Sequence, residues 1–221
     1  MTDRRSPVSG LYAVTPDVAD SAWLRARVAQ ALAGGARILQ YRSKSPDRAL
    51  MARQACELAA LCRAQGVLFI VNDDVQIACE CGAHGVHLGR EDAAIAAARA
   101  QLGDDALIGA SCYDDLARAQ QCVDAGADYL AFGSFYPSAV KPGAARATPA
   151  LLREARARWH LPLVAIGGIT PVNAPPLLAA GADALAVISG LFQVPDTYAA
   201  ARAFRRLFDA RSRSASLDAT A

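Results

Sequence analysis

The chain has 221 residues, of which 53% are hydrophobic and 20% are charged, and its net charge is +2. This composition is typical of a compact globular enzyme and excludes a disordered or fibrous protein, while the small net charge argues against a nucleic-acid-binding or polybasic membrane-binding surface. No apolar run reaches membrane-spanning length and the first residues are polar, so we expect a cytoplasmic protein that binds neither nucleic acid nor membrane.

A pattern of helix end, glycine and apolar run recurs four times along the chain. The four copies contain Gly34-Gly35-Ala36, Cys81-Gly82-Ala83, Ala125-Gly126-Ala127 and Ala180-Gly181-Ala182. Glycine suits a helix C-terminus that needs left-handed backbone, and the short apolar run that follows suits a strand buried on both faces. The repeat therefore predicts helices that alternate with parallel strands.

Short apolar runs between turn signals predict eight strands, and alanine-rich segments of helical length, such as 23–32, 49–64 and 93–102, lie between them. This alternation predicts an α/β fold, a single (β/α)8 TIM barrel over residues 1–210, with a doubly wound open sheet as the alternative. The small, polar residues 211–221 predict a disordered tail. The expected strands are 10–14, 37–40, 68–72, 85–88, 107–110, 129–133, 163–167 and 184–188.

Three long polar side chains follow the expected second strand. Gln40, Arg42 and Lys44 stand at alternate positions, so they share one face if the chain stays extended. Two of them are cations, which predicts an anionic ligand, although a strand end that merely reaches solvent has the same pattern. Of the 23 basic residues only Lys44 and Lys141 are lysines, and a lysine supplies a compact ammonium that arginine does not imitate.

Carboxylates follow the next two expected strands. Asn72 and Asp73 come directly after an apolar run, and Asp92 follows the fourth strand; each of these residue types is also a common helix cap. The ends of neighbouring strands lie together in a barrel, so Asp73 and Asp92 are candidate ligands of Mg²⁺. Mg²⁺ and the cations of the second strand end would together hold a phosphate or diphosphate.

The remaining strand ends supply a hydroxyl, a long loop and glycines. Ser111 and Cys112 follow the fifth strand, and Cys112 is a weak candidate nucleophile because no base is visible beside it. The loop 133–148 carries Lys141, and Gly167-Gly168 and Ile188-Ser189 follow the last two strands, where barrels of this kind commonly bind phosphate. The six cysteines lack zinc-type spacing, and His87 lies inside a strand, as expected of a hydrogen-bonded core residue.

Together, segments 40–44, 71–73, 85–92, 132–141, 166–170 and 188–189 resemble those of the thiamine phosphate synthase family, and the resemblance runs from about Leu11 to Phe208. It implies a barrel transferase that uses Mg²⁺ to join a hydroxymethylpyrimidine diphosphate to a thiazole phosphate, with release of diphosphate. It also implies that the pyrimidine diphosphate is held by Gln40, Arg42, Lys44 and Asn72, that Mg²⁺ is bound by Asp73 and Asp92, and that the pyrimidine substrate or its diphosphate is also contacted by Ser111 and Lys141. For the second substrate, it implies that the thiazole is contacted by Ser138 and Val140 and that its phosphate is bound by Gly168, Ile188 and Ser189. By this resemblance Arg42, Lys44, Ser111 and Lys141 are the catalytic residues.

One departure concerns the loop, where the family commonly has threonines and this chain has Ser138 and Val140. Valine has no hydroxyl, so a side-chain hydrogen bond to the thiazole at position 140 is lost.

Three rival functions are compatible with a barrel of this kind. An aldolase-type enzyme would use one lysine as a Schiff base, a thiazole tautomerase would resemble the fold without joining two substrates, and a non-catalytic barrel would only bind thiazole phosphate. None of the three needs two carboxylates, three cationic side chains and a second anion site together. The sequence is compatible with a homo-oligomer and leaves open whether a carboxylated thiazole phosphate is the preferred substrate.

Overall fold

A computed structural model of the chain describes residues 8–89, 93–137 and 147–218. The described residues contain eight parallel strands that pair in sequence order, and β1 pairs with β8 to close a barrel. The predicted (β/α)8 barrel is therefore confirmed, and the open sheet is excluded. The strands are β1 (Gly10–Val14), β2 (Ala36–Tyr41), β3 (Leu68–Asn72), β4 (Gly85–Leu88), β5 (Leu107–Tyr113), β6 (Tyr129–Phe132), β7 (Leu163–Ile166) and β8 (Ala184–Val187).

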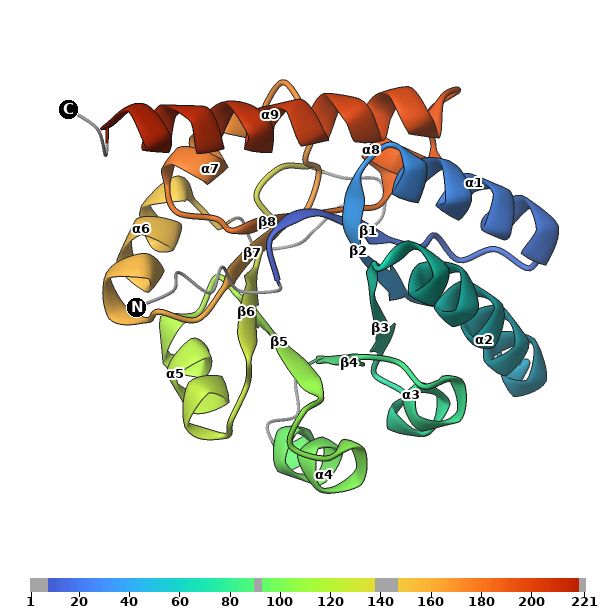
Figure 1. Cartoon of the computed structure of the whole chain (residues 1–221). Coiled ribbons are helices and arrows are strands. Elements are labelled where there is room, and N and C mark those ends of the chain that lie inside the picture. Colours follow the sequence, from blue (N-terminus) through green and yellow to red (C-terminus); the bar gives the residue numbers. More distant parts are fainter. Residues whose placement is uncertain (1–7, 90–92, 138–146, 219–221) are drawn as a thin grey trace.

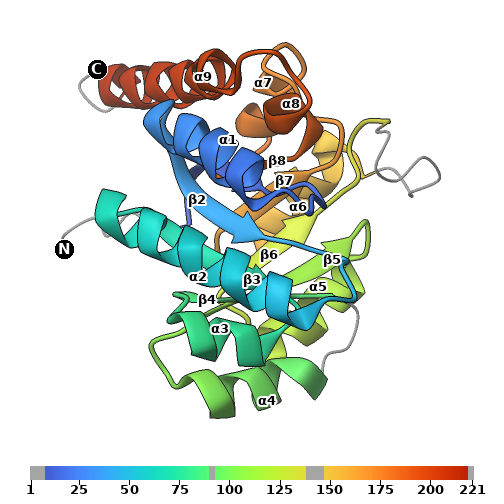
Figure 2. The ribbon, with the colours of Figure 1, turned by 90° about the vertical axis from the view of Figure 1, so that its right-hand side faces the viewer.

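Helices alternate with the strands and surround the barrel (Figure 1). Seen from the side, α9, α1, α2, α3 and α4 succeed one another along its outer wall (Figure 2). None of the helices within the described ranges combines the length and apolar character needed to cross a membrane. The helices are α1 (Ser21–Ala33), α2 (Arg48–Gln65), α3 (Val75–Cys81), α4 (Ala93–Leu102), α5 (Leu116–Asp124), α6 (Pro149–Arg158), α7 (Pro175–Ala179), α8 (Ser189–Phe192) and α9 (Thr197–Asp218).

Each of the four sequence repeats lies at the end of a helix, directly before the strand that follows it. In each repeat one glycine has positive φ, a conformation that glycine adopts without steric cost. The chain therefore turns at once from the helix end into the next strand. These glycines are Gly35 (φ 108), Gly82 (φ 61), Gly126 (φ 92) and Gly181 (φ 102).

The helix starts follow an equally simple rule. Asp20, Asp47, Asp74 and Asp115 each precede a helix and accept a hydrogen bond from a backbone N–H in its first turn. Such a cap pairs donors that lack a partner inside the helix and contributes about 1 kcal/mol. These caps fix the lengths of the loops that leave the carboxyl ends of β1, β2, β3 and β5.

The end of the chain differs from the expectation, because α9 continues to Asp218 where a disordered tail is predicted from Arg211. The Arg211 guanidinium donates a hydrogen bond of 2.6 Å to the carbonyl of Ala182 and lies over the ring of Phe208. Residues 211–218 contain no glycine or proline to end the helix. Residues 211–213 are exposed, and α9 as a whole packs on α1 and α8 (Figure 1).

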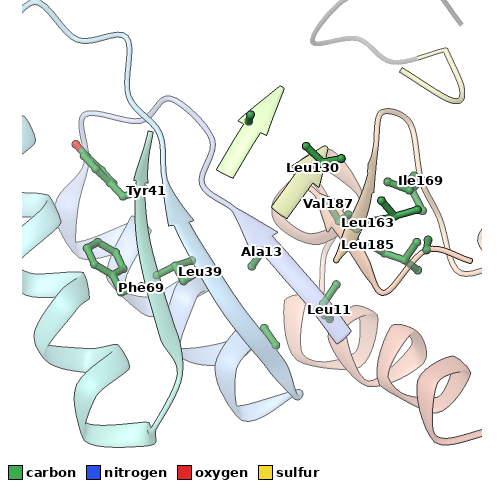
Figure 3. Packing of buried hydrophobic residues seen from close by; sticks show 14 of the residues in the cluster. Leu11, Ala13, Leu39, Tyr41, Phe69, Leu130, Leu163, Ile169, Leu185 and Val187 are labelled. Carbon is green, nitrogen blue, oxygen red and sulfur yellow. The ribbon is translucent and has the colours of Figure 1, made fainter. Parts of the chain in front are cut away.

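Buried side chains form two separate layers. The larger one lies between strands and helices, and Figure 3 shows Leu11 and Ala13 of β1 and Leu39 and Tyr41 of β2 in it. Strand residues of the opposite parity form the second layer, which fills the barrel interior. The buried members of this interior layer are Val8, Tyr12, Val14, Ile38, Ile70, Tyr129, Ala131, Val164, Ala184 and Ala186.

The ring of Tyr129 fills the space in which a side chain of Gly109 on the neighbouring strand β5 would lie. A Cβ atom added at Gly109 would lie 1.9 Å from Cζ of Tyr129, far inside van der Waals contact. Gly109 is therefore required for space rather than for backbone conformation. The smallest residue on β5 accommodates one of the largest side chains of the interior.

We expect Gly109→Ala to lower the free energy of unfolding by roughly 1–3 kcal/mol, the usual cost of overpacking a core. The cost should be clearly smaller in a Tyr129→Leu background, because the shorter side chain leaves room for the added methyl group. Urea unfolding of the four proteins of this double-mutant cycle measures the coupling. Equal costs in the two backgrounds would contradict the assigned contact.

Candidate active site

Two consecutive residues at the end of β2 point in opposite directions. Gln40 points into the barrel, where its Nε2 donates a hydrogen bond of 2.9 Å to the hydroxyl of Tyr12. Tyr41 points outward and donates a 2.9 Å hydrogen bond to Gln54 on α2. The strand alternation thus holds Gln40 in the interior, close to the carboxyl end of the barrel.

Arg42 and Lys44 follow the last residue of β2, so regular strand geometry does not extend to them. Their backbone is held by the loop after β1, because Arg42 exchanges two hydrogen bonds with the Thr15 hydroxyl and Lys44 N–H donates to Asp17. Arg42 is half-buried and Lys44 is exposed. The two cations are thereby placed on the rim above Gln40.

The three polar residues after β3 have different roles. Asp74 is the helix cap, since its carboxylate accepts from Ile77 N–H at 2.8 Å. Asp73 is not a cap: it has a positive φ of 61°, its N–H donates to the carbonyl of His87, and its carboxylate accepts a 2.6 Å hydrogen bond from Asn72 Nδ2. The capping interpretation therefore applies to Asp74 and leaves Asn72 and Asp73 for the site.

The Asp73 carboxylate lies beside the segment that follows β4. A Cβ atom added at Gly89 would lie 3.7 Å from Asp73 Oδ1. Asp73 is exposed, and its two carboxylate oxygens are hard ligands of the kind that Mg²⁺ prefers. Within the described ranges no group of three or more His, Cys, Asp or Glu side chains could hold a metal ion; Asp92 lies outside these ranges.

Ser111 lies inside β5 and not after it, because this strand continues to Tyr113, beyond the expected end at residue 110. Its hydroxyl is 2.9 Å from Nε2 of His87 on the neighbouring β4. Arg118 of α5 donates to the Ser111 carbonyl and to the Gly89 carbonyl. One guanidinium thus ties together the carboxyl ends of β4 and β5.

Cys112, the next residue, is no nucleophile in this structure. Its side chain is fully buried among the outer-layer residues. The neighbouring Cys122 thiol and burial together raise the pKa of Cys112 well above that of a free thiol. A thiol that stays protonated and has no access to solvent does not attack a substrate.

The glycines after β7 lie against the loop after β6. Gly168 has φ 62°, and a Cβ atom there would lie 2.4 Å from the carbonyl oxygen of Pro137, so only glycine fits. Asn173 accepts a hydrogen bond from Thr170 N–H and donates one to the Gly168 carbonyl. Tyr136 donates from its hydroxyl to the carbonyl of Asn173. Asn173 therefore fixes the glycine turn, a role that its sequence position did not signal.

Ile188 and Ser189 join β8 to the short helix α8. Ile188 packs against the interior layer from above, and Ser189 is the first residue of the helix. They lie on the same side of the barrel mouth as Gly168, since β7 and β8 are paired. Three other predicted site residues, Ser138, Val140 and Lys141, lie outside the described residues.

Tyr12 and Tyr129 are the polar residues of the interior that sequence reasoning missed. Their hydroxyls are 2.8 Å apart, and Tyr129 is also 3.2 Å from Nδ1 of His87. Burial raises the pKa of both tyrosines and lowers the pKa of His87 to about 4, so all three are neutral near pH 7. The expectation that His87 is a hydrogen-bonded core residue is confirmed.

Comparison with known proteins identifies the relatives of this chain. The model of the thiamine monophosphate synthase family matches residues 11–191. The chain belongs to this family. The thiamine-phosphate synthase of Chromobacterium violaceum is 58% identical over 204 residues, which cover 92% of this chain and 98% of the relative. That of Thiobacillus denitrificans is 56% identical over 201 residues, or 91% and 95% of the two chains.

Solved structures agree with membership of the thiamine monophosphate synthase family. A thiamine phosphate pyrophosphorylase from Pyrococcus furiosus has 34% sequence identity and a TM-score of 0.79, over 90% of this chain and 95% of its own. A structure described as native KDPGal, with 19% identity and a TM-score of 0.70, shares the fold alone. The predicted family is confirmed, and these matches give no support to the aldolase-type, tautomerase or binding-protein alternatives.

The buried His87 has a consequence for stability. An unfolded histidine has a pKa near 6.5, so below about pH 6.5 the unfolded chain binds a proton that the folded protein does not. Stability is therefore full above this pH and falls as the pH drops toward 4, the folded-state pKa of His87.

We expect His87 to contribute a loss of about 2 kcal/mol in unfolding free energy between about pH 7.5 and about pH 5. The His87→Gln variant should be less stable at both pH values but lose about 2 kcal/mol less across this interval. Urea unfolding of both proteins at the two pH values measures the difference. Parallel pH dependences would show that His87 does not titrate in the unfolded chain alone.

Proposed function

We propose that this chain is a Mg²⁺-dependent thiamine-phosphate synthase, a transferase. It would join 4-amino-2-methyl-5-hydroxymethylpyrimidine diphosphate to 4-methyl-5-(2-phosphoethyl)thiazole, or to the carboxylated form of this thiazole, and give thiamine phosphate and diphosphate. The observation that carries the proposal is the high identity to thiamine-phosphate synthases over nearly the whole chain. The polar residues at the carboxyl ends of the strands support it, because this end of a barrel carries the active site.

In this reaction a carbon–oxygen bond to diphosphate breaks, and the leaving oxygen keeps the electron pair. A carbon–nitrogen bond then forms with the lone pair of the thiazole nitrogen, which becomes positively charged. The pyrimidine passes through a cation-like state, because its electron-rich ring stabilises the methylene carbon as diphosphate departs. The barrier is therefore lowered chiefly by stabilising negative charge on the leaving group.

Arg42, Lys44 and Lys141 are the residues to which we assign this role. Arg42 and Lys44 follow β2 on the rim, with backbones held by Thr15 and Asp17. Cations that are already in place when charge develops need no reorganisation, and this makes them effective in catalysis. Lys141, on the loop after β6, would contact the diphosphate from another side.

Mg²⁺ would be held by Asp73 and Asp92. The Asp73 carboxylate is exposed, has one oxygen hydrogen-bonded to Asn72 and lies beside Gly89, the residue from which the chain leads to Asp92. Protein sites for Mg²⁺ commonly use one or two carboxylates together with substrate phosphates. When bound, Mg²⁺ supplies positive charge that offsets the charge of the departing diphosphate.

The two heterocycles would occupy different sides of the mouth. Gln40, Asn72 and Ser111 would hold the pyrimidine, and Ser111 counts among the catalytic residues because it contacts the ring that carries the charge. Ser138 and Val140 would contact the thiazole, while Gly168, Ile188 and Ser189 would bind its phosphate. Support comes from the β7–β8 side, where the glycine turn at Gly168 and the start of α8 at Ser189 follow paired strands, the position at which barrels of this kind commonly bind phosphate.

The proposed reaction needs no general base. The thiazole nitrogen attacks with a free lone pair, so positioning matters more than proton removal. His87 is the buried histidine nearest the site, and its low pKa keeps it neutral. A neutral imidazole does not repel the positive charge that develops on the pyrimidine.

The purified protein should form thiamine phosphate and diphosphate from the two substrates when Mg²⁺ is present, and turnover should stop when EDTA removes the metal and resume when Mg²⁺ is restored. Chromatography of thiamine phosphate and an enzymatic assay of diphosphate measure the two products independently. Absence of both products with Mg²⁺ present would refute the proposed function. Undiminished turnover in EDTA would refute the metal requirement.

Two adjacent aspartates provide a matched test of the metal role. Asp73→Asn should lower kcat/KM on the order of 100-fold or more, the scale seen when one preorganised electrostatic group is lost. Asn tolerates positive φ and can still accept from Asn72, so the fold should be retained. The substitution should raise the Mg²⁺ concentration needed for half-maximal rate, because the proposed metal site loses a negative charge.

Asp74→Asn is the control, because asparagine caps helices as well as aspartate does. The 2.6 Å ion pair between Asp74 and Arg48 is partly exposed, so its loss should cost no more than about 1 kcal/mol. Activity of this variant should stay near that of the wild type. Equal loss of activity in the two variants would contradict the separate roles.

A further inference from the structure

A continuous row of side-chain hydrogen bonds crosses the barrel interior between two proposed pyrimidine contacts. It starts at Gln40 on β2 and ends at Ser111 on β5. The successive distances are 2.9 Å from Gln40 Nε2 to Tyr12 Oη, 2.8 Å from Tyr12 Oη to Tyr129 Oη, 3.2 Å from Tyr129 Oη to His87 Nδ1, and 2.9 Å from His87 Nε2 to Ser111 Oγ. We call these five residues the interior chain.

The middle of the interior chain is closed to water. Tyr12 is 1% exposed, Tyr129 is 0% exposed and His87 is 9% exposed. The aliphatic and alanine side chains of the interior layer surround the tyrosines, and Gly109 leaves the space for one of their rings. Buried polar groups need hydrogen bonds, and each of these three side chains has its hydrogen-bond partners within the interior chain.

The hydrogen bonds of the interior chain must all run in the same direction. A tyrosine hydroxyl has one hydrogen and two lone pairs, and accepting from both partners would leave its buried hydrogen unpaired. A buried hydroxyl between two partners therefore donates to one and accepts from the other. A neutral imidazole likewise has one N–H and one bare nitrogen. The direction of the first bond therefore determines every later one.

The first bond sets this direction through the Gln40 amide nitrogen, which faces Tyr12 and acts only as a donor. Tyr12 then donates to Tyr129, and Tyr129 donates to Nδ1 of His87. His87 carries its hydrogen on Nε2 and donates to Ser111. The chain thus leaves Oε1 of Gln40 as a free acceptor and the hydrogen of Ser111 as a free donor.

We propose that Tyr12, Tyr129 and His87 are positioning residues that present Gln40 as an acceptor and Ser111 as a donor, and that they thereby select a 4-aminopyrimidine over its 4-oxo analogue. This inference rests on the proposed function and adds the source of its substrate specificity. The amine of the aminopyrimidine donates, and its ring nitrogens accept. The 4-oxo compound has a carbonyl in place of the amine and an N–H next to it, so its pattern is reversed at these positions.

An oxo compound could be paired only if the whole interior chain reversed. The Gln40 amide would have to turn over, both tyrosine hydrogens and the histidine hydrogen would have to move, and Ser111 would have to donate to His87. Otherwise buried donors and acceptors face groups of their own kind, which sites built for hydrogen bonding reject strongly. Removing one hydroxyl from the middle should uncouple the two ends.

The first measurement is the tautomer of His87 in the substrate-free wild-type protein. Nitrogen NMR of histidine-labelled protein distinguishes hydrogen on Nε2 from hydrogen on Nδ1, and His87→Gln assigns the signal among the three histidines. We expect the Nε2–H tautomer at neutral pH. The Nδ1–H tautomer would mean that the hydrogen bonds of the interior chain run in the opposite direction, and it would overturn the proposal.

The second measurement compares the dissociation constants of the 4-amino and 4-oxo pyrimidine diphosphates by calorimetry, with Mg²⁺ and without thiazole phosphate so that no turnover occurs. The wild type should prefer the amino compound by roughly 100-fold or more. Tyr129→Phe should reduce this preference by about tenfold or more, since it breaks the interior chain at its centre. Tyr12→Phe breaks the same chain at the neighbouring position and should have the same effect.

Tyr41→Phe is the matched control. Tyr41 is also a fully buried tyrosine of a barrel strand that makes one 2.9 Å side-chain hydrogen bond, but it faces α2 outside the interior. This variant should keep the preference of the wild type. Unchanged preference in both Tyr129→Phe and Tyr12→Phe, or an equal reduction in Tyr41→Phe, would overturn the positioning role.

The outcomes separate this inference from the proposed function. If both pyrimidines bind equally well and thiamine phosphate is formed, only the inference is refuted. If neither pyrimidine binds and no thiamine phosphate is formed, the proposed function is refuted and the specificity with it. The tautomer measurement depends on neither substrate and tests the direction of the chain in both cases.

Discussion

Closing eight strands into a barrel creates an interior that side chains have to fill. In this protein Tyr12 and Tyr129 fill much of it, and each brings a hydroxyl that needs a partner away from water. The two hydroxyls bond to each other, and their remaining bonds reach Gln40 and His87. The side chains that pack the interior therefore also position the polar groups at the mouth of the barrel. A change in the size of an interior residue would reach the mouth through these bonds.

The same arrangement separates charged groups from neutral ones by depth. Arg42 and Lys44 lie on the rim beyond the last residue of β2, where the proposed diphosphate would be accessible to solvent. Below them, the groups that would face the pyrimidine are the amides of Gln40 and Asn72 and the hydroxyl of Ser111, and the imidazole behind Ser111, that of His87, is neutral. A leaving group that gains negative charge and a ring that gains positive charge need opposite surroundings, and this layering supplies both.

Much of the fold could be read from the sequence because its signals are local. The repeated glycine before each of four strands reports a backbone requirement of that residue alone, and the structure confirms it at Gly35, Gly82, Gly126 and Gly181. The polar residues at the ends of β2 and β3 were also visible, because they interrupt apolar runs. The family resemblance added residue roles that local patterns do not determine.

The features that escaped sequence reasoning depend on contacts between distant segments. The hydrogen bond between Tyr12 and Tyr129 joins residues 117 positions apart and exists only once β1 and β6 face each other across the interior. The last strand residues of β5 are held by pairing with β6, which carries the strand past residue 110. The helix beyond Arg211 is likewise anchored by a carbonyl, that of Ala182, which precedes β8.

The backbone of Asp73 sets the stability of the fold against the metal-binding role that we propose for this residue. Its φ of 61° lies in a region that residues with a Cβ atom seldom occupy, although asparagine and aspartate do so more often than others, and such a conformation costs on the order of 1 kcal/mol or more. Glycine at this position would relieve that strain and remove the carboxylate at the same time. Selection for thermal resistance alone would therefore favour loss of this carboxylate, and engineering for heat tolerance should exclude the position or screen for turnover in parallel.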